Sequence, residues 1–239
     1  MPRFFLESIN KECPCITGDD ARHIGRSLRM KTGECITVCA GSTDYECRIK
    51  SFTEDAVFLE ILSSHVCGSE PNIKVTLYQA VPKLDKLEHI VQKSVELGVT
   101  EIVPVLTRRC ISRPAEKDFK KKLDRLNKIA LEAAKQSGRG IIPKVSMLTS
   151  FNGAVERMKN DDCPLMLYEE GGIRFSEVDT AEKKSYSILV GSEGGFDPEE
   201  ALLAENSGVQ SVWLGNRILR CETAPVTALS ILMYITKNM

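Results

Sequence analysis

The sequence predicts an α/β protein in two parts, a small β-barrel followed by a layered domain with a mainly parallel sheet. Two observations predict this order. Short apolar strands dominate residues 1 to about 70, whereas strands alternate with helices from residue 73 onward. The polar link 67–72 separates the two patterns. We therefore expect one domain at 1–70 and a second at 73–239.

The first part contains four predicted strands, each bounded by turn residues. They cover residues 3–6, 34–39, 45–49 and 56–62. Between the first two strands, residues 19–29 predict a short helix with Arg22, Arg26 and Arg29 spaced along one side. Such a row of arginines suits contact with phosphate.

The second part alternates strands and helices, as expected for a parallel sheet covered by helices. Its predicted strands are 73–81, 101–106, 144–148, 164–168, 187–191 and 211–214, and its predicted helices are 84–97, 118–136, one from Asp197 to Gly208, and 225–237. The third helix has the clearest start, because Asp197 suits the N-cap, Pro198 the first helical position and Glu200 the capping box.

Composition excludes several classes of protein. With 42% hydrophobic and 27% charged residues, the chain has the profile of an ordinary globular protein, and its net charge of -1 argues against a uniformly basic surface. The basic residues are concentrated at 108–144, a stretch that contains twelve Lys or Arg and four Asp or Glu. A solvated helix face and an RNA-binding band both fit this stretch.

Neither a membrane span nor a signal peptide is predicted, so we expect a cytoplasmic protein. The nine cysteines are scattered and odd in number, which predicts reduced thiols. No Cys-x-x-Cys occurs, and we therefore expect no metal site.

Two loops carry the residues that point to chemistry. The first, 191–196, places three glycines directly after an apolar strand, where ligands of parallel sheets bind. It matches neither the dinucleotide nor the P-loop motif, and a plain strand-to-helix turn is the alternative. The second, 214–224, mixes two arginines, a glutamate and apolar residues. Its alternative is a surface pair, Arg220 with Glu222, beside side chains docked on the core.

Both loops resemble those of the knotted α/β RNA methyltransferases, the SPOUT superfamily. The resemblance is closest to the family that methylates N3 of a uridine in 16S (small-subunit) ribosomal RNA. It runs along the chain, with further similar segments at 2–5, 23–29, 83–86, 92–99 and 132–139. Two positions depart from the family pattern, Ser192 where proline is usual and Cys221 where threonine is common.

The resemblance implies a C-terminal domain with a trefoil knot, a PUA-like N-terminal barrel that helps to hold RNA, and a homodimer formed near the cofactor site. It implies small-subunit ribosomal RNA, within the ribosomal particle, as the partner. It also implies S-adenosylmethionine as the cofactor. The residues implied to enclose this cofactor are Leu167, Gly191, Gly194, Gly195, Leu214, Gly215, Ile218 and Leu219.

The chemistry of a uridine target asks for further groups. Because the uracil nitrogen is protonated at neutral pH, attack needs a base or stabilisation of the anion. We expect Arg220 to stabilise the negative charge and Glu222 to accept the proton, with Glu193 as the second candidate. The residues expected to contact RNA phosphate are Arg3, Arg22, Arg26, Arg29, Arg108, Arg109, Arg113 and Arg139.

Two other functions remain open at this point. An enzyme of the same fold could act on a ribose 2′-hydroxyl instead of the base. A non-catalytic assembly factor would bind RNA without binding S-adenosylmethionine.

Overall fold

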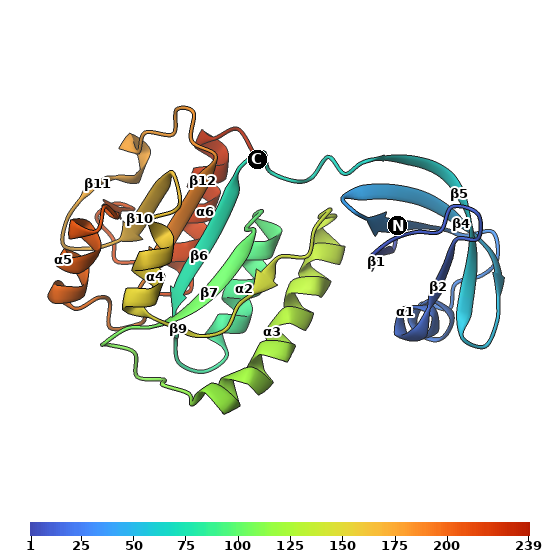
Figure 1. The fold of residues 1–239 in the computed structure, drawn as a ribbon, viewed down its shortest axis with the longest axis horizontal. Coiled ribbons are helices and arrows are strands. Elements are labelled where there is room, and N and C mark those ends of the chain that lie inside the picture. Colours follow the sequence, from blue (N-terminus) through green and yellow to red (C-terminus); the bar gives the residue numbers. More distant parts are fainter. The chain divides into compact units, whose positions relative to one another are not determined.

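The computed structural model describes residues 1–239 and divides them into two compact units (Figure 1). One unit consists of Met1–Glu70 with Ala134–Ile141, and the other of Pro71–Ala133 with Ile142–Met239. Nothing in the sequence pattern indicates that residues 134–141, the end of a long helix and the turn after it, group with the first unit. No helix in either unit combines the length and the apolar character that crossing a bilayer requires.

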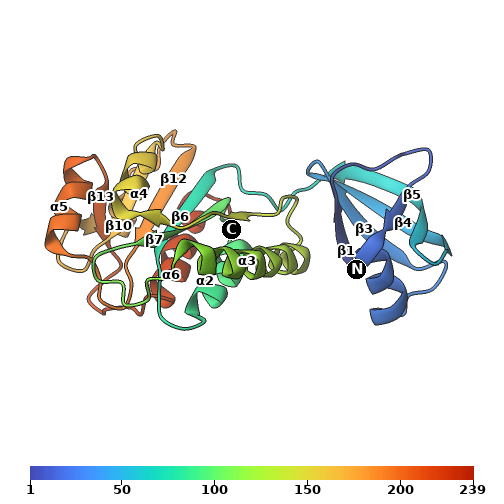
Figure 2. The same cartoon turned by 60° about the horizontal axis from the view of Figure 1, so that its bottom comes forward.

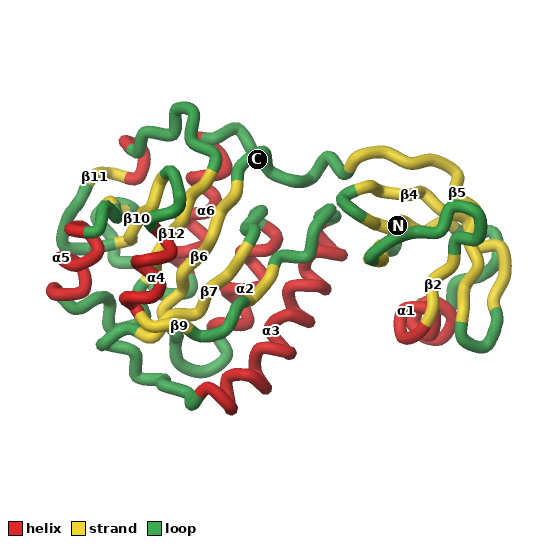
Figure 3. Tube along the Cα trace, in the orientation of Figure 1, coloured by secondary structure: helices red, strands yellow, loops and turns green.

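The first unit is built mainly from strands, as the colouring of Figure 3 shows. Its sheet has the order β1-β3-β4-β5-β2, in which β1 is parallel to β3 and the other neighbours are antiparallel. The strands are β1 Arg3–Leu6, β2 Cys15–Thr17, β3 Cys35–Ala40, β4 Thr43–Phe52 and β5 Ala56–Val66. Alternate side chains such as Phe4, Ile36 and Ile49 are buried together in one apolar core.

The predicted helix at 19–29 is wrong in its extent. Helix α1, Gly18–Arg22, continues as the π-helical turn η1, His23–Ser27, and there the helical backbone ends. Arg29 lies beyond that end with a positive φ of 53°. A helical spacing therefore does not place Arg29 on one face with Arg22 and Arg26.

The second unit has an eight-stranded sheet in which every pairing is parallel. Its order is β11-β13-β10-β12-β6-β7-β8, with β9 also on β7. The strands are β6 Lys74–Ala80, β7 Glu101–Leu106, β8 Lys144–Val145, β9 Thr149–Ser150, β10 Cys163–Leu167, β11 Ile173–Arg174, β12 Ser185–Val190 and β13 Gln210–Trp213. The single strand predicted at 144–148 is wrong, because β7 pairs with two short strands separated by a break.

Helices cover both faces of this sheet (Figure 2). They are α2 Lys86–Glu96, α3 Glu116–Ser137, α4 Phe151–Met158, the short 3-10 helix η2 Phe175–Glu177, α5 Pro198–Asn206 and α6 Thr223–Ile235. Apolar residues of α4 and α5 pack on one face around Tyr78 and Leu189, whereas α2 and α6 contact each other on the opposite face. Helix α4 was not predicted.

The start of α5 confirms the prediction made for it. The Asp197 carboxylate accepts a hydrogen bond from the Glu199 amide at 3.1 Å, and Glu200 Oε2 accepts one from the Asp197 amide at 3.2 Å. This capping box fixes the direction in which the chain leaves the loop after β12. The three neighbouring strands β13, β10 and β12 all end at the same edge of the sheet, and their following loops meet there.

Candidate active site

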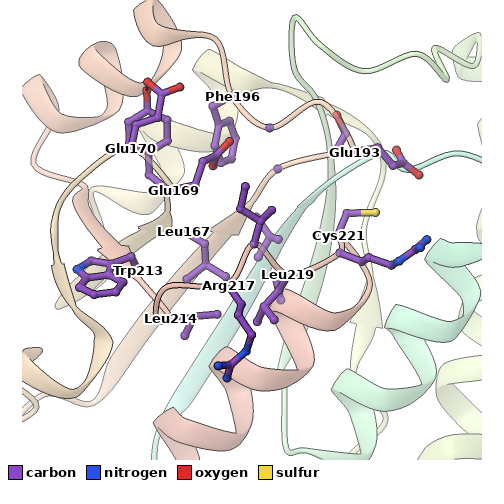
Figure 4. Close-up of a pocket in the computed structure, with 18 of the residues that line it drawn as sticks. Leu167, Glu169, Glu170, Glu193, Phe196, Trp213, Leu214, Arg217, Leu219 and Cys221 are labelled. Carbon is purple, nitrogen blue, oxygen red and sulfur yellow. Dashed lines mark hydrogen bonds between the residues drawn. The ribbon is translucent and has the colours of Figure 1, made fainter.

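A pocket of about 850 Å³ opens at this edge of the sheet (Figure 4). Its wall comes from the segments that follow three parallel strands, 167–171 after β10, 190–196 after β12 and 212–221 after β13. Lys86, at the start of α2, and Ala224 complete it. Sites of this size at the carboxyl ends of parallel strands are typical of small-molecule binding.

The glycines after β12 are required by the space around them. A Cβ on Gly191 would lie 3.2 Å from the backbone of Gly195 across the turn, and Ser192 and Gly195 form a β-bridge there. Gly195 has a φ of +67°, and a Cβ on it would lie 2.5 Å from Glu169 Oε1. A larger residue at Gly195 would therefore need a strained backbone and would displace the Glu169 carboxylate from the pocket wall.

Three further contacts hold this glycine loop in place. Gln79 Nε2 donates to the Gly191 carbonyl at 3.2 Å, and Arg109 Nη1 donates to the Gly194 carbonyl at 3.2 Å. The Ser192 hydroxyl in turn donates to the Arg109 carbonyl at 3.4 Å. The loop is thus tied to β6 and to the turn after β7, and Ser192 contributes one of these ties.

The second loop brings apolar side chains to the opposite wall. Leu214 and Leu219 of this loop lie close to Leu167, the last residue of β10, in Figure 4, and all three line the cavity. Gly215 permits the turn between them through a φ of +114°. Ile218 also lines the pocket although it is 88% exposed, which leaves its side chain at the rim.

Carboxylates gather at the same pocket. Glu169 and Glu170 follow β10, and Glu193 belongs to the glycine loop. Glu170 accepts a hydrogen bond from the Tyr168 hydroxyl at 3.0 Å, whereas Glu169 points toward the cavity beside Phe196 (Figure 4). Glu169 and Glu170 form no ion pair with the protein, so their side of the pocket favours a positively charged group of a ligand.

Lys86 joins two of the acidic side chains. Its ammonium lies 3.1 Å from Glu193 Oε1 and 3.1 Å from Glu222 Oε2. Burial acts to raise the pKa of Glu222, but the hydrogen bonds from Lys86, from its own backbone amide and from the Cys221 thiol, together with the charge of Lys86, outweigh burial, and the pKa lies below its ordinary value. Burial also acts to raise the pKa of Glu193, but hydrogen bonds from its own backbone amide, from Lys86 and from the Lys83 amide together lower that pKa below its ordinary value. Both carboxyl groups are therefore ionised at neutral pH.

Cys221 lies beside this cluster but is not a nucleophile. Burial, and then its hydrogen bond to Glu222, raise the pKa of the thiol to about 12. At neutral pH the thiolate population is negligible, because nucleophilic cysteines need a lowered pKa.

The structure gathers most of the residues that the sequence singled out. All eight predicted cofactor residues line this one pocket, and so does Arg220. Glu222 does not line the pocket itself, but its carboxylate contacts Lys86, which does. The surface pair considered for Arg220 and Glu222 is not formed, because the ionic partner of Glu222 is Lys86.

Sequence reasoning missed several lining residues. These are Glu169, Glu170, Phe196, Trp213 and Arg217. Trp213 is the last residue of β13, and Glu169 and Glu170 lie two and three positions beyond the end of β10, so the strand ends themselves were a usable signal.

Two arginines expected to contact phosphate have a structural role instead. The Arg3 side chain is 8% exposed and pairs with Asp44 at 2.5 Å inside the first unit. The Arg139 side chain is 3% exposed and pairs with Glu70 through Nε at 2.8 Å and Nη2 at 2.7 Å. Groups buried and paired in this way are not available to RNA, so these two predictions are corrected.

The remaining predicted arginines are exposed but differ in their partners. Arg108 pairs with Asp197 and Glu199, and Arg113 donates to the Thr107 carbonyl at 2.8 Å. Arg22 pairs with Asp19, and Arg26 and Arg29 are exposed near it. Contact of these side chains with RNA stays a prediction.

Known proteins resemble this chain over its whole length. The family described as "RNA methyltransferase domain" matches residues 69–233, and the family described as "RNA methyltransferase PUA domain" matches residues 16–62. Ribosomal RNA small subunit methyltransferase E of Bacillus subtilis (strain 168) is 36% identical over 99% of this chain and 98% of its own length. The chain belongs to the ribosomal RNA small subunit methyltransferase E family.

Solved structures agree with this membership of the methyltransferase E family. The methyltransferase E of Neisseria gonorrhoeae, bound to S-adenosyl methionine, is 30% identical and superposes with a TM-score of 0.89 over 98% of both chains. A putative methyltransferase of Legionella pneumophila, in complex with the same cofactor, is also 30% identical, with a TM-score of 0.87 over 98% of this chain and 97% of that one. The predicted fold class, a parallel α/β domain with a PUA-like domain, is confirmed, whereas the knot stays a prediction.

Proposed function

We propose that the protein transfers a methyl group from S-adenosylmethionine to N3 of a uridine in 16S ribosomal RNA. The observation that carries this proposal is the pocket at the ends of β10, β12 and β13, together with membership of the methyltransferase E family. The relatives from Neisseria and Legionella are described with S-adenosylmethionine bound, which supports the same cofactor for this chain.

The residues of the pocket fit this cofactor. Leu167, Leu214 and Leu219 offer an apolar wall for an adenine ring. Glu169 and Glu170 place negative charge at the same cavity, which suits a molecule bearing a sulfonium and an ammonium group. The glycines at 191 and 195 are required by the tight packing of the turn that forms this part of the wall.

S-adenosylmethionine supplies an electrophilic methyl group on its sulfonium. The protein then has to hold the uracil nitrogen in line with that methyl, a positioning effect worth about 7–11 kcal/mol of the barrier. Arg220 is exposed at the pocket wall and stabilises the negative charge of the uracil oxygens. Glu222 accepts or relays the proton of N3 as a carboxylate, and Glu193 is the second candidate.

We place the RNA contacts on Arg22, Arg26 and Arg29 of the PUA domain and on Arg108, Arg109 and Arg113 near the pocket. The protein acts in the cytoplasm on the small-subunit particle, and its last helix is part of a trefoil knot.

A homodimer is the assembly we propose. Helix α6 supports it, since Val226 and Ile231 are only half-buried and Tyr234 is 76% exposed on an otherwise apolar helix. A second copy covering this face would produce twice the chain mass in light scattering, and a monomer at micromolar concentration would contradict the dimer.

The function is tested with labelled S-adenosylmethionine and unmodified small-subunit particles or 16S RNA. Mass spectrometry of the labelled nucleotide should locate the methyl on N3 of a uridine. A methyl on a ribose 2′-hydroxyl would replace the proposed target and keep the enzyme class. RNA binding without label transfer, and without affinity for the cofactor, would favour a non-catalytic assembly factor.

A further inference from the structure

Two of the loops that line the pocket, the glycine loop and the loop after β13, have no direct hydrogen bond or ion pair to each other. The glycine loop, residues 191–196, is tied to β6 and to the turn after β7. The second loop, residues 214–224, runs into the first turn of α6, which begins at Thr223. The side chain that connects them is Lys86 at the first turn of α2, through Glu193 on one loop and Glu222 on the other.

The geometry points to Lys86 as a positioning residue that holds both pocket loops in the arrangement that methyl transfer needs. This inference rests on the proposed function. A single ammonium lies 3.1 Å from each of two carboxylates that come from segments 29 positions apart in the chain. All three side chains are only about a quarter exposed, at 26% for Lys86, 26% for Glu193 and 23% for Glu222. Limited exposure reduces the screening of such a cluster by solvent.

The charge of the cluster makes Lys86 necessary. Without it, two carboxylates would face the same space, and repulsion would drive the loops apart or protonate one acid. The groups around Glu222 are Lys86 from α2, Glu193 from the glycine loop and the adjacent Cys221 thiol, so Lys86 is the one cation that faces it. Hydrogen bonding to Glu222, and then to Glu193, raises the pKa of Lys86, which therefore stays protonated wherever both acids are ionised.

Lys86 also determines where Glu222 points. Glu222 is the residue before α6 and its side chain makes no cap hydrogen bond to that helix. Its carboxylate contacts are Lys86, its own backbone amide and the Cys221 thiol at 3.2 Å, and of these Lys86 is the one that comes from another element and carries charge. Loss of Lys86 therefore leaves the proposed proton acceptor without a strong orienting partner.

The first test is amide hydrogen exchange of the cofactor-free protein. Lys86→Met keeps the length of the side chain and removes its charge, and Lys86→Arg keeps the charge. Lys93→Met is the matched control, since it breaks another ion pair of α2, to Glu96 at 2.9 Å. We expect Lys86→Met to speed exchange of both loops about five- to thirtyfold, while Lys86→Arg and Lys93→Met stay near wild type.

Variants of the two carboxylates test each ion pair of the bridge, Lys86 with Glu193 and Lys86 with Glu222, separately. Glu193→Gln should speed exchange in the glycine loop and leave the second loop slow, and Glu222→Gln should do the reverse. These variants keep Lys86 and decide the question even if Lys86→Met fails to fold. Equal exchange rates in wild type and in all of these variants would overturn the bridge.

Kinetics then test whether the bridge matters for methyl transfer. Lys86→Met should lower kcat about 100-fold, as a small misplacement of the site does, with a nearly unchanged KM for RNA. The acid limb of its pH–rate profile should move to higher pH, because Glu222 loses the ammonium that lowers its pKa, and Lys86→Arg should restore both properties. A wild-type kcat and pH profile in Lys86→Met would refute the inference. Absence of methyl transfer by the wild-type protein would instead refute the proposed function. The hydrogen-exchange experiment would still test whether Lys86 holds the two loops, because it does not depend on activity.

Discussion

Replacement of Arg139 by alanine should destabilise the protein and leave its intrinsic affinity for RNA unchanged. The guanidinium forms two parallel hydrogen bonds to Glu70, and the Arg139 side chain is 3% exposed. Removing one partner of a buried pair costs about 3–5 kcal/mol, since the other charge is left uncompensated. Glu70 would keep its hydrogen bonds from the amides of Gly140 and Ile141, so we expect the lower end, about 3 kcal/mol.

Thermal unfolding followed by circular dichroism measures this cost. For a chain of this size, about 3 kcal/mol corresponds to a fall in Tm of about 6–12 °C. RNA binding, measured well below that Tm, should keep both its affinity and its dependence on salt. A variant with unchanged Tm, weaker RNA binding and a salt slope smaller by about 1 would show instead that Arg139 contacts phosphate.

The pH dependence gives an independent check of the same pair. Burial acts to raise the pKa of Glu70, but the Arg139 guanidinium and two backbone amides outweigh it and hold the pKa below its ordinary value. A lowered carboxyl pKa stabilises the fold above the pKa of the unfolded chain, and this contribution is lost as the pH falls through the folded-state pKa. The difference in stability between wild type and Arg139→Ala should therefore be full at neutral pH and shrink below about pH 4.

Four further outcomes are expected. Gly195→Ala should destabilise the fold by about 1–2 kcal/mol through its positive φ and weaken binding of S-adenosylmethionine in calorimetry, whereas Gly68→Ala, where a Cβ meets no atom, should change neither. Asp197→Ala should cost about 1 kcal/mol in denaturant unfolding through loss of the α5 cap, and an unchanged midpoint would contradict that role. Joint replacement of Arg22, Arg26 and Arg29 by alanine should reduce the slope of log affinity for RNA against log salt by about 2, and an equal slope would exclude phosphate contact there. Because burial raises the pKa of Cys221 to about 12, iodoacetamide at pH 8 should label it far more slowly than the exposed Cys13, as peptide mass spectrometry would report.

Local signals in the sequence were sufficient for much of the second unit. The strand at 101–106 and the capping box of Asp197 and Glu200 depend on neighbours within a few positions, and the structure reproduces both. Helix α4 was missed although Ser150 caps it and Phe151, Ala154 and Val155 follow a helical spacing. Its eight residues include Gly153, and so short a helix is stable mainly through its packing on the sheet.

The roles of the arginines could not be predicted in the same way. Arg3 lies 41 positions from Asp44, and Arg139 lies 69 positions from Glu70, so neither acid is visible from the local sequence. A basic stretch therefore predicts positive charge without showing which charges are already neutralised by distant carboxylates. The same limit applies to Arg108, whose partners Asp197 and Glu199 come from the start of α5.

For the pocket too, the features that depend on local sequence could be predicted and those that depend on distant residues could not. Its position could be predicted, because loops after parallel strands meet at one edge of the sheet and the glycines mark two of those loops. Its ionic connections could not. Arg220 and Glu222 are two residues apart, but the chain is already coiled there, with the Arg220 carbonyl accepting from the amides of Thr223 and Ala224. Side chains two positions apart in such a coil do not face each other, which leaves Glu222 to a partner from α2 and Arg220 exposed for substrate.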